Sequence, residues 1–325
     1  MGRIRGGFLK VAAATPRVKV ADCGANAAAI AQLIESAAER GVSIVAFPEL
    51  SVTGATCGDL FRQQRLLDAA EAALESLLTH FEPIVAVVGM PIRYNSHIYN
   101  CAVVISEGVI HGVVPKSYCS GSVFTAGRGT ENRYINLCDQ MVPFGSDLIF
   151  SLDGVKFGIE IGEDAAQIIT PSAELASAGA AITICIDAQA ECSGSYATLK
   201  EVVTCHSKAI AGGHIYCSAG TGESSTDYLF AGNALVAQQG EILAVSERFT
   251  RTATLTVADI DVEQIESSRL KAGSTTLCDC YRVLELPTMV VDSAIERSVD
   301  PAPFIPKDID SGCYEIVEMQ AAALA

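Results

Sequence analysis

The sequence lacks a hydrophobic run long enough to cross a membrane. No apolar stretch reaches the roughly 18 uncharged residues that a membrane-spanning helix needs. The nearest one, residues 175–186, is bounded by Glu174 and Asp187. Near the N-terminus, Lys10 interrupts the apolar residues, so we expect a strand there rather than a signal peptide. A membrane partner is therefore not expected.

Basic residues are also scarce. The chain has 22 Lys and Arg against 38 Asp and Glu, which gives a formal net charge of −16. Such a chain repels phosphate backbones, so nucleic acid is not expected as a partner. Apolar residues make up 50% of the chain and charged residues 18%. This composition is sufficient for a sizeable core and argues against general disorder.

A cysteine framework is missing as well. The 12 cysteines are scattered over 325 residues without a Cys-x-x-Cys motif, and Cys278 and Cys280 form a single Cys-x-Cys. This distribution is typical of reduced thiols in a cytoplasmic protein rather than of a disulfide scaffold. No histidine follows closely enough to complete a zinc site with these cysteines, so we expect no bound metal.

Apolar strands and helical segments alternate along the chain. Turn dipeptides at Glu107-Gly108 and Asp153-Gly154 each join two apolar strands, which predicts two hairpins. Hairpins mixed with strand–helix units predict an α/β protein with mixed sheets and helices packed outside. Helices are expected at residues 26–40, 60–81, 172–178 and 195–211, and strands at 8–14, 43–47, 83–90, 97–106, 108–115, 147–152, 155–161, 181–186, 214–219, 234–237, 242–245 and 252–257.

The composition changes near the C-terminus. Prolines punctuate a segment of weak periodicity, which indicates an extended arm; they are Pro287, Pro301, Pro303 and Pro306. A helical pattern follows and continues to the last residue, with Ile316, Met319 and Ala323 on one face. We therefore expect one domain over residues 1–285, and an extended arm with the start of a linker helix over residues 286–325.

Three short segments place charged residues at the ends of buried strands, where active sites are commonly built. Glu49 directly follows an apolar strand, so its pKa can rise toward that of a general base; the alternative is a surface glutamate. Lys116 could stabilise an oxyanion, against the alternative of an exposed structural lysine. Glu163 and Asp164 could bind a metal, against the alternative of an exposed acidic turn.

Together these segments resemble the Glu-Lys-Cys triad segments of the nitrilase superfamily. The matching runs are FPELSVTG (47–54), VVPKSY (113–118) and FGIEIGED (157–164). Residues 220–249 and the proline-rich tail with its helix are similar, more specifically, to the N-terminal glutaminase domain of glutamine-dependent NAD+ synthetases. The resemblance covers essentially the whole chain.

The resemblance implies a four-layer α-β-β-α sandwich with an extended C-terminal arm, and hydrolysis of glutamine. In the family a cysteine thiolate attacks the amide, the glutamate (Glu49 here) transfers the proton, and the lysine (Lys116 here) stabilises the oxyanion. The released ammonia serves NAD+ biosynthesis in a synthetase domain, present in cis or in trans. ATP and magnesium belong to that domain, so no cofactor is expected here. A homo-oligomer is also implied.

The nucleophile itself is absent, because Gly162 stands at the position of the family's cysteine. Glu163 is retained as an implied substrate-binding residue. Departures from the family pattern cluster around the implied glutamine pocket, at Ser122, Gly127, Ala165, Ala166, Gln189 and Ser195. Because several positions have changed together, we expect hydrolysis to be impaired.

Three hypotheses stay open, and whether the chain is an enzyme is uncertain from sequence. The first is a glutaminase-type domain that has lost its nucleophile and acts as a scaffold for a synthetase using free ammonia. The second is an active amidase that uses a relocated thiol, Cys119 or Cys192, or water activated by Glu49; Cys185 is expected to be buried and inert. The third is a non-catalytic module that binds a small ligand through Glu49, Lys116 and Glu163.

Overall fold

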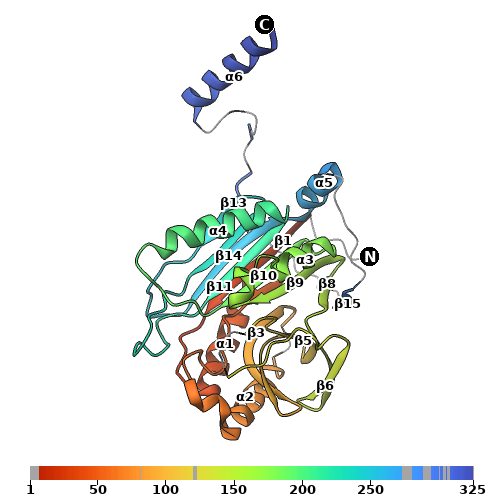
Figure 1. Ribbon diagram of the computed structural model, residues 1–325, viewed down its shortest axis with the longest axis vertical. Helices are drawn as coiled ribbons and strands as arrows, with labels where there is room; N and C mark the ends of the chain where they lie inside the picture. The colour runs from red at the N-terminus through yellow and green to blue at the C-terminus, as the bar shows by residue number, and fades with distance from the viewer. Residues whose placement is uncertain are drawn as a thin grey trace. The chain divides into compact units, whose positions relative to one another are not determined.

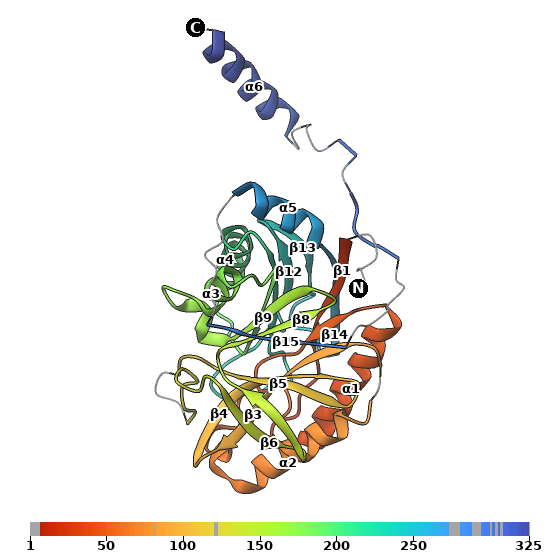
Figure 2. The same ribbon diagram turned by 90° about the vertical axis from the view of Figure 1, so that its right-hand side faces the viewer.

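Two mixed β-sheets face each other at the centre of the fold (Figures 1 and 2). The computed structural model describes residues 7–80, 82–119, 123–272, 280–287, 294–299, 301–302, 305 and 308–324. In spatial order, sheet A contains β14 (Thr254–Asp261), β1 (Phe8–Thr15), β2 (Ile44–Ala46), β3 (Val85–Tyr94), β4 (His97–Ser106), β5 (Val109–Pro115), β7 (Gln140–Phe144) and β6 (Arg133–Leu137). Sheet B contains β13 (Glu241–Val245), β12 (Ala234–Gln238), β11 (Gly213–Ser218), β10 (Ile182–Asp187), β9 (Val155–Ile161), β8 (Leu148–Leu152) and β15 (Arg282–Glu285).

Helices cover the outer face of each sheet. Sheet A packs against α1 (Cys23–Glu39) and α2 (Gln64–Leu77), which follows the short 3-10 helix η2 (Gly58–Arg62). Sheet B packs against α3 (Pro171–Ser177) and α4 (Ser195–Ala209). The 3-10 helix η3 (Gly162–Ala166) follows β9, and α5 (Val262–Ala272) follows β14. The expected four-layer α-β-β-α sandwich is therefore confirmed.

Strand β1 shows how the layers arise from the sequence. Every residue from Leu9 to Thr15 is buried, and alternate side chains point to opposite faces of a strand. Leu9, Val11 and Ala13 enter the apolar layer between the two sheets. Ala12 and Ala14 enter the layer beneath α1 and α2. A continuous apolar run therefore marks a strand that is covered on both sides.

Both expected hairpins are present, and two others were missed, β3–β4 at Asn95-Ser96 and β6–β7. Strands β4–β5 and β8–β9 turn at Glu107-Gly108 and Asp153-Gly154, and all four residues have positive φ. Strands β6 and β7 turn at Cys138-Asp139, with φ of +49° and +58°. Because neither residue of this turn is glycine, the sequence carries no turn signal there. Strand β15 and helix α5 were missed as well.

The C-terminal part of the chain forms a separate unit. The described contacts divide the chain into Met1–Ile295 and Glu296–Ala325. The expected C-terminal helix is present as α6 (Ile309–Leu324), and none of its described side chains is buried. Pro303 and Pro306 lie outside the described residues. Among the helices that are described, none has the length and apolar character needed to span a bilayer.

The segment that carries Glu49 lies directly against β3. Phe47 N donates to Val87 O at 2.9 Å, and Val52 N donates to Gly89 O at 3.1 Å. This close contact between the Glu49 segment and β3 requires glycine at position 89, since a Cβ there would lie 2.5 Å from Leu50 N and would also overlap Pro48 O. Both of these atoms belong to backbone, which cannot move aside as a side chain can.

A Gly89→Ala substitution is therefore expected to lower the free energy of unfolding by about 3 kcal/mol, because overpacking displaces the Glu49 segment. Denaturant unfolding monitored by circular dichroism would measure the change. Gly24→Ala is the matched control: it lies in α1 with no atom within 4 Å of the added Cβ, so stability should be unchanged or slightly raised. Equal losses in the two variants would contradict the packing argument.

Candidate active site

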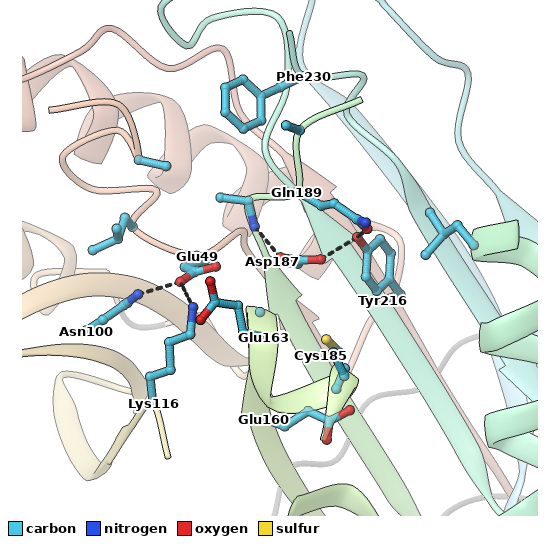
Figure 3. A pocket seen from close by; sticks show the side chains of 18 of the residues that line it. Glu49, Asn100, Lys116, Glu160, Glu163, Cys185, Asp187, Gln189, Tyr216 and Phe230 are labelled. Carbon is cyan, nitrogen blue, oxygen red and sulfur yellow. Dashed lines mark hydrogen bonds and ion pairs between the residues drawn. The ribbon is translucent and has the colours of Figure 1, made fainter. Parts of the chain in front are cut away.

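A cavity of about 1050 Å³ lies where strands from both sheets end. Sheet A contributes Glu49, which follows β2, and Lys116, which follows β5. Sheet B contributes Gly162, which follows β9, and Asp187, the last residue of β10. Figure 3 shows these strand ends converging on one space. The structure thus brings together the three segments that the sequence singled out.

Glu49 is a buried carboxylate, with 6% of its surface exposed. Its Oε1 accepts hydrogen bonds from Lys116 Nζ at 2.9 Å and from Asn100 Nδ2. Burial raises the pKa of Glu49 to about 7, against the attraction of Lys116, and the nearby Asp187 adds to the rise. The surface-glutamate alternative is wrong, and this carboxyl group has a pKa suited to proton transfer near neutral pH.

Lys116 is buried too, with 9% of its surface exposed. Burial disfavours its charge, but the attraction and hydrogen bond of Glu49 outweigh burial and hold its pKa above the usual value. Lys116 therefore stays protonated and can stabilise negative charge in the cavity. The exposed-lysine alternative is wrong.

Gly162 faces this ion pair. A Cβ built on Gly162 would lie 2.5 Å from Glu49 Oε2 and 2.9 Å from Lys116 Nζ. The backbone of Gly162 has a φ of +52°, a conformation that favours glycine. Any side chain at this position would point directly at the two charged groups, so Gly162 occupies the place that a nucleophile served by Glu49 would need.

The two acids after Gly162 have different surroundings. Glu163 is exposed and lines the cavity. Asp164 is buried, and its carboxylate accepts the backbone N–H groups of Ser117 at 2.9 Å and Tyr118 at 2.8 Å. Burial raises the pKa of Asp164 to about 6 although these hydrogen bonds oppose the rise. The exposed-turn interpretation is wrong for Asp164, which ties the end of β9 to the segment after Lys116.

The implied substrate-binding residues are only partly described. Gln189 and Ser195 both line the cavity. The single hydroxyl proton of Ser195 is shared between two acceptors, Cys192 O at 2.7 Å and Glu191 Oε1 at 2.5 Å, so Ser195 also stabilises the start of α4. Ser122 lies outside the described residues.

Asp187 and Asn100 are among the polar residues of the cavity that the sequence did not single out. Asp187 accepts a hydrogen bond from Tyr216 Oη at 2.6 Å, and burial raises its pKa. Asn100 lies within β4 and donates to Glu49. A signal existed for each: Asp187 ends an apolar strand as Glu49 follows one, and Asn100 interrupts an otherwise apolar run.

The thiols near the cavity are not activated. Cys119 and Cys185 line it. Burial raises the pKa of Cys119 to about 11, even though Lys116 opposes the rise, and burial holds the pKa of Cys185 well above the usual value. Cys192 is exposed and is not part of the described cavity lining. A nucleophilic cysteine needs a lowered pKa, and neither of these lining thiols has one.

Comparisons with known proteins agree with this geometry. The sequence model of the carbon–nitrogen hydrolase family matches residues 10–270. Glutamine-dependent NAD(+) synthetase of Mycobacterium tuberculosis is 34% identical over 343 residues, covering 98% of this chain and 50% of the relative. The corresponding Drosophila melanogaster protein is 29% identical, covering 81% of this chain and 36% of the relative. The chain thus spans about half the length of the mycobacterial relative and a smaller share of the Drosophila relative.

Solved structures show the same fold. The glutamine-dependent NAD(+) synthetase of Cytophaga hutchinsonii superposes with a TM-score of 0.69 at 23% identity, over 78% of this chain and 43% of that chain. An amidase from Nesterenkonia sp. gives 0.62 at 18% identity, over 83% and 97%. The resemblance noted in the sequence is confirmed. The family match extends over most of the residues that build the sandwich and its cavity, and the chain belongs to the carbon–nitrogen hydrolase family.

Proposed function

We propose that this chain is the glutaminase-type domain of an NAD+ synthetase, that it has lost its hydrolytic nucleophile, and that it acts as a scaffold for a synthetase domain using free ammonia. The observation that carries the proposal is Gly162, whose missing side chain would face Glu49 and Lys116. The similarity to glutamine-dependent NAD(+) synthetases supports the other parts of the proposal, which are the glutaminase-type domain and its synthetase partner.

Covalent amide hydrolysis needs a thiolate at this place. The nucleophile attacks the amide carbon, and the base carries the thiol proton to the leaving ammonia. Glu49 and Lys116 retain the base and the oxyanion-stabilising charge, but glycine cannot form an acyl-enzyme. In a serine hydrolase the loss of the nucleophile costs about 10⁶-fold in kcat. The raised pKa values of Cys119 and Cys185 argue against a relocated thiol among the cysteines that line the described cavity.

In this proposal the synthetase domain acts in cis or in trans, and ATP and magnesium bind to that domain. The sandwich supplies its contact surface, and a homo-oligomer and a cytoplasmic location belong to the same proposal. The acidic sandwich domain itself would need no cofactor for this role.

A second candidate is a module that binds a small polar molecule without converting it. The cavity persists, and Asn100 Oδ1 is a buried atom without a hydrogen-bond partner among the described residues. This candidate predicts that glutamine, glutamate or a dinucleotide raises the thermal unfolding midpoint in a concentration-dependent way. Thermal shift measurements with each compound would check it. If no compound changes the unfolding midpoint at millimolar concentrations, the scaffold without a bound ligand remains as the function.

The proposal predicts that the purified chain releases no ammonia or glutamate from glutamine above the buffer rate. The physical reason is that no thiol with a lowered pKa lines the described cavity. A coupled ammonia assay with chromatographic detection of glutamate would measure both products.

The paired sample is Gly162→Cys. We expect it to be silent with glutamine as well, because the other departures around the pocket remain in place. If this variant hydrolyses glutamine and the native chain does not, then the thiol is the only catalytic group that the native pocket lacks. Ammonia release by the native chain would contradict the proposal.

Without a nucleophile, the main remaining task of the ion pair is to keep two buried charges compatible with the fold. In Lys116→Met the pKa of Glu49 should rise further above about 7, because the attraction and hydrogen bond of Lys116 no longer oppose burial. A raised carboxyl pKa stabilises the folded state at low pH, and this contribution disappears as the pH rises through the folded-state value. We expect a deficit of about 1 kcal/mol at pH 6 that grows to about 3 kcal/mol at pH 9.

Denaturant unfolding at both pH values would measure this growth. Lys19→Met is the matched control: Lys19 lies 4.0 Å from Asp22, and 70% of its side chain is exposed. Surface pairs of this kind contribute about 0.5 kcal/mol or less at any pH. A deficit in Lys116→Met that does not change with pH would show that Glu49 is not held by Lys116.

A further inference from the structure

Three metal-ligating side chains meet in the cavity at a place that the nitrilase-type chemistry does not use. Glu160 comes from β9, His206 from α4 and His214 from β11. One ligand atom of each lies within 4.8 Å of the other two, and all three residues line the cavity. Figure 3 shows Glu160 beside Cys185, on a part of the wall away from Glu49.

Glu160 presents an unsatisfied carboxylate oxygen. The residue is 1% exposed, and its Oε2 accepts Ser172 N at 3.0 Å. Its Oε1 is buried without a hydrogen-bond partner among the described residues. A buried, unpartnered carboxylate oxygen is costly, and either a proton or a cation compensates it. The two neighbouring imidazoles make a cation the better match.

The hydrogen bonds of His214 leave it ready to bind a metal. Its Nδ1 lies 2.8 Å from Thr183 Oγ1, and Thr183 Oγ1 donates to Gly213 O at 3.5 Å. With Nδ1 protonated, the threonine oxygen accepts from Nδ1–H, and the Nε2 lone pair is available. A metal-binding histidine usually donates its other ring N–H in this way.

His206 is arranged similarly. Its Nε2 lies 2.7 Å from Ser172 Oγ, which donates to Thr170 Oγ1 at 3.0 Å. With Nε2 protonated, Ser172 Oγ accepts from Nε2–H, and Nδ1 of His206 keeps its lone pair.

We propose that Glu160, His206 and His214 form a binding site for a zinc-class divalent cation. Two neutral imidazoles and one carboxylate are a donor set that suits zinc and its first-row neighbours. Three protein ligands leave a further coordination position, and the three residues line the cavity, so water or a polar atom of a small molecule can occupy that position. The site stands independently of the proposed loss of glutamine hydrolysis.

The test uses the full chain, stripped with EDTA and titrated with Zn²⁺ by calorimetry. We expect one zinc ion per chain, and affinities at least about 100-fold weaker in His206→Gln and in His214→Gln. The control is His80→Gln, because Glu35, His80 and Glu82 form a second, more exposed group of possible ligands. This variant should bind as the native chain does. Failure of the native chain to bind, or loss of binding in His80→Gln alone, would overturn the proposal.

Two further measurements guard against misfolded variants and wrong ligands. Glu160→Gln retains the side-chain shape and should also weaken binding, with an unchanged far-ultraviolet spectrum in EDTA. X-ray absorption of the zinc-loaded native chain needs no variant, and it should show nitrogen and oxygen ligands with two imidazoles. A sulfur ligand would assign the ion to one of the cysteines instead and would contradict this site.

Discussion

The buried contact between Glu49 and Lys116 is the interaction on which the site depends. It joins the ends of β2 and β5 in one sheet and faces the end of β9 in the other. Neither charge can be buried alone without a cost of several kcal/mol. Asn100, Asp164 and the close approach of Gly89 then fix the segments that carry the pair. The Glu49–Lys116 contact therefore shapes the cavity and stabilises the fold at the same time.

In the proposed function, this coupling explains how a catalytic arrangement persists after the nucleophile is lost. Loss of a side chain at Gly162 removes the covalent route but leaves no buried charge unpaired. Loss of Lys116 or Glu49 would destabilise the fold itself. Selection for a folded scaffold is consequently sufficient to retain two of the three triad positions. The Glu49–Lys116 pair does not by itself demonstrate hydrolysis. The raised pKa values of Cys119 and Cys185 argue against either one as a substitute nucleophile.

Much of the fold could be predicted from the sequence, because continuous apolar runs and glycine-containing turns report local structure directly. The turn at Cys138-Asp139 could not, since both residues adopt positive φ without glycine. The strand ends that the sequence singled out do meet, since Lys116 contacts Glu49 and Gly162 faces both. The group of Glu160, His206 and His214 was not found, because its members lie on three elements and only the packing of α4 on sheet B brings them together. Cysteine spacing carries no information about such a site.

The proposed function requires that no nucleophile operates in the cavity. The most direct test exposes the chain to an electrophilic glutamine analogue, such as a diazoketone, and measures the intact mass and the labelled peptides. The account predicts no modification at Cys119 or Cys185, the cysteines that line the cavity. Stoichiometric labelling of either one, prevented by excess glutamine, would show that a relocated thiol binds and attacks the substrate, and would contradict the account.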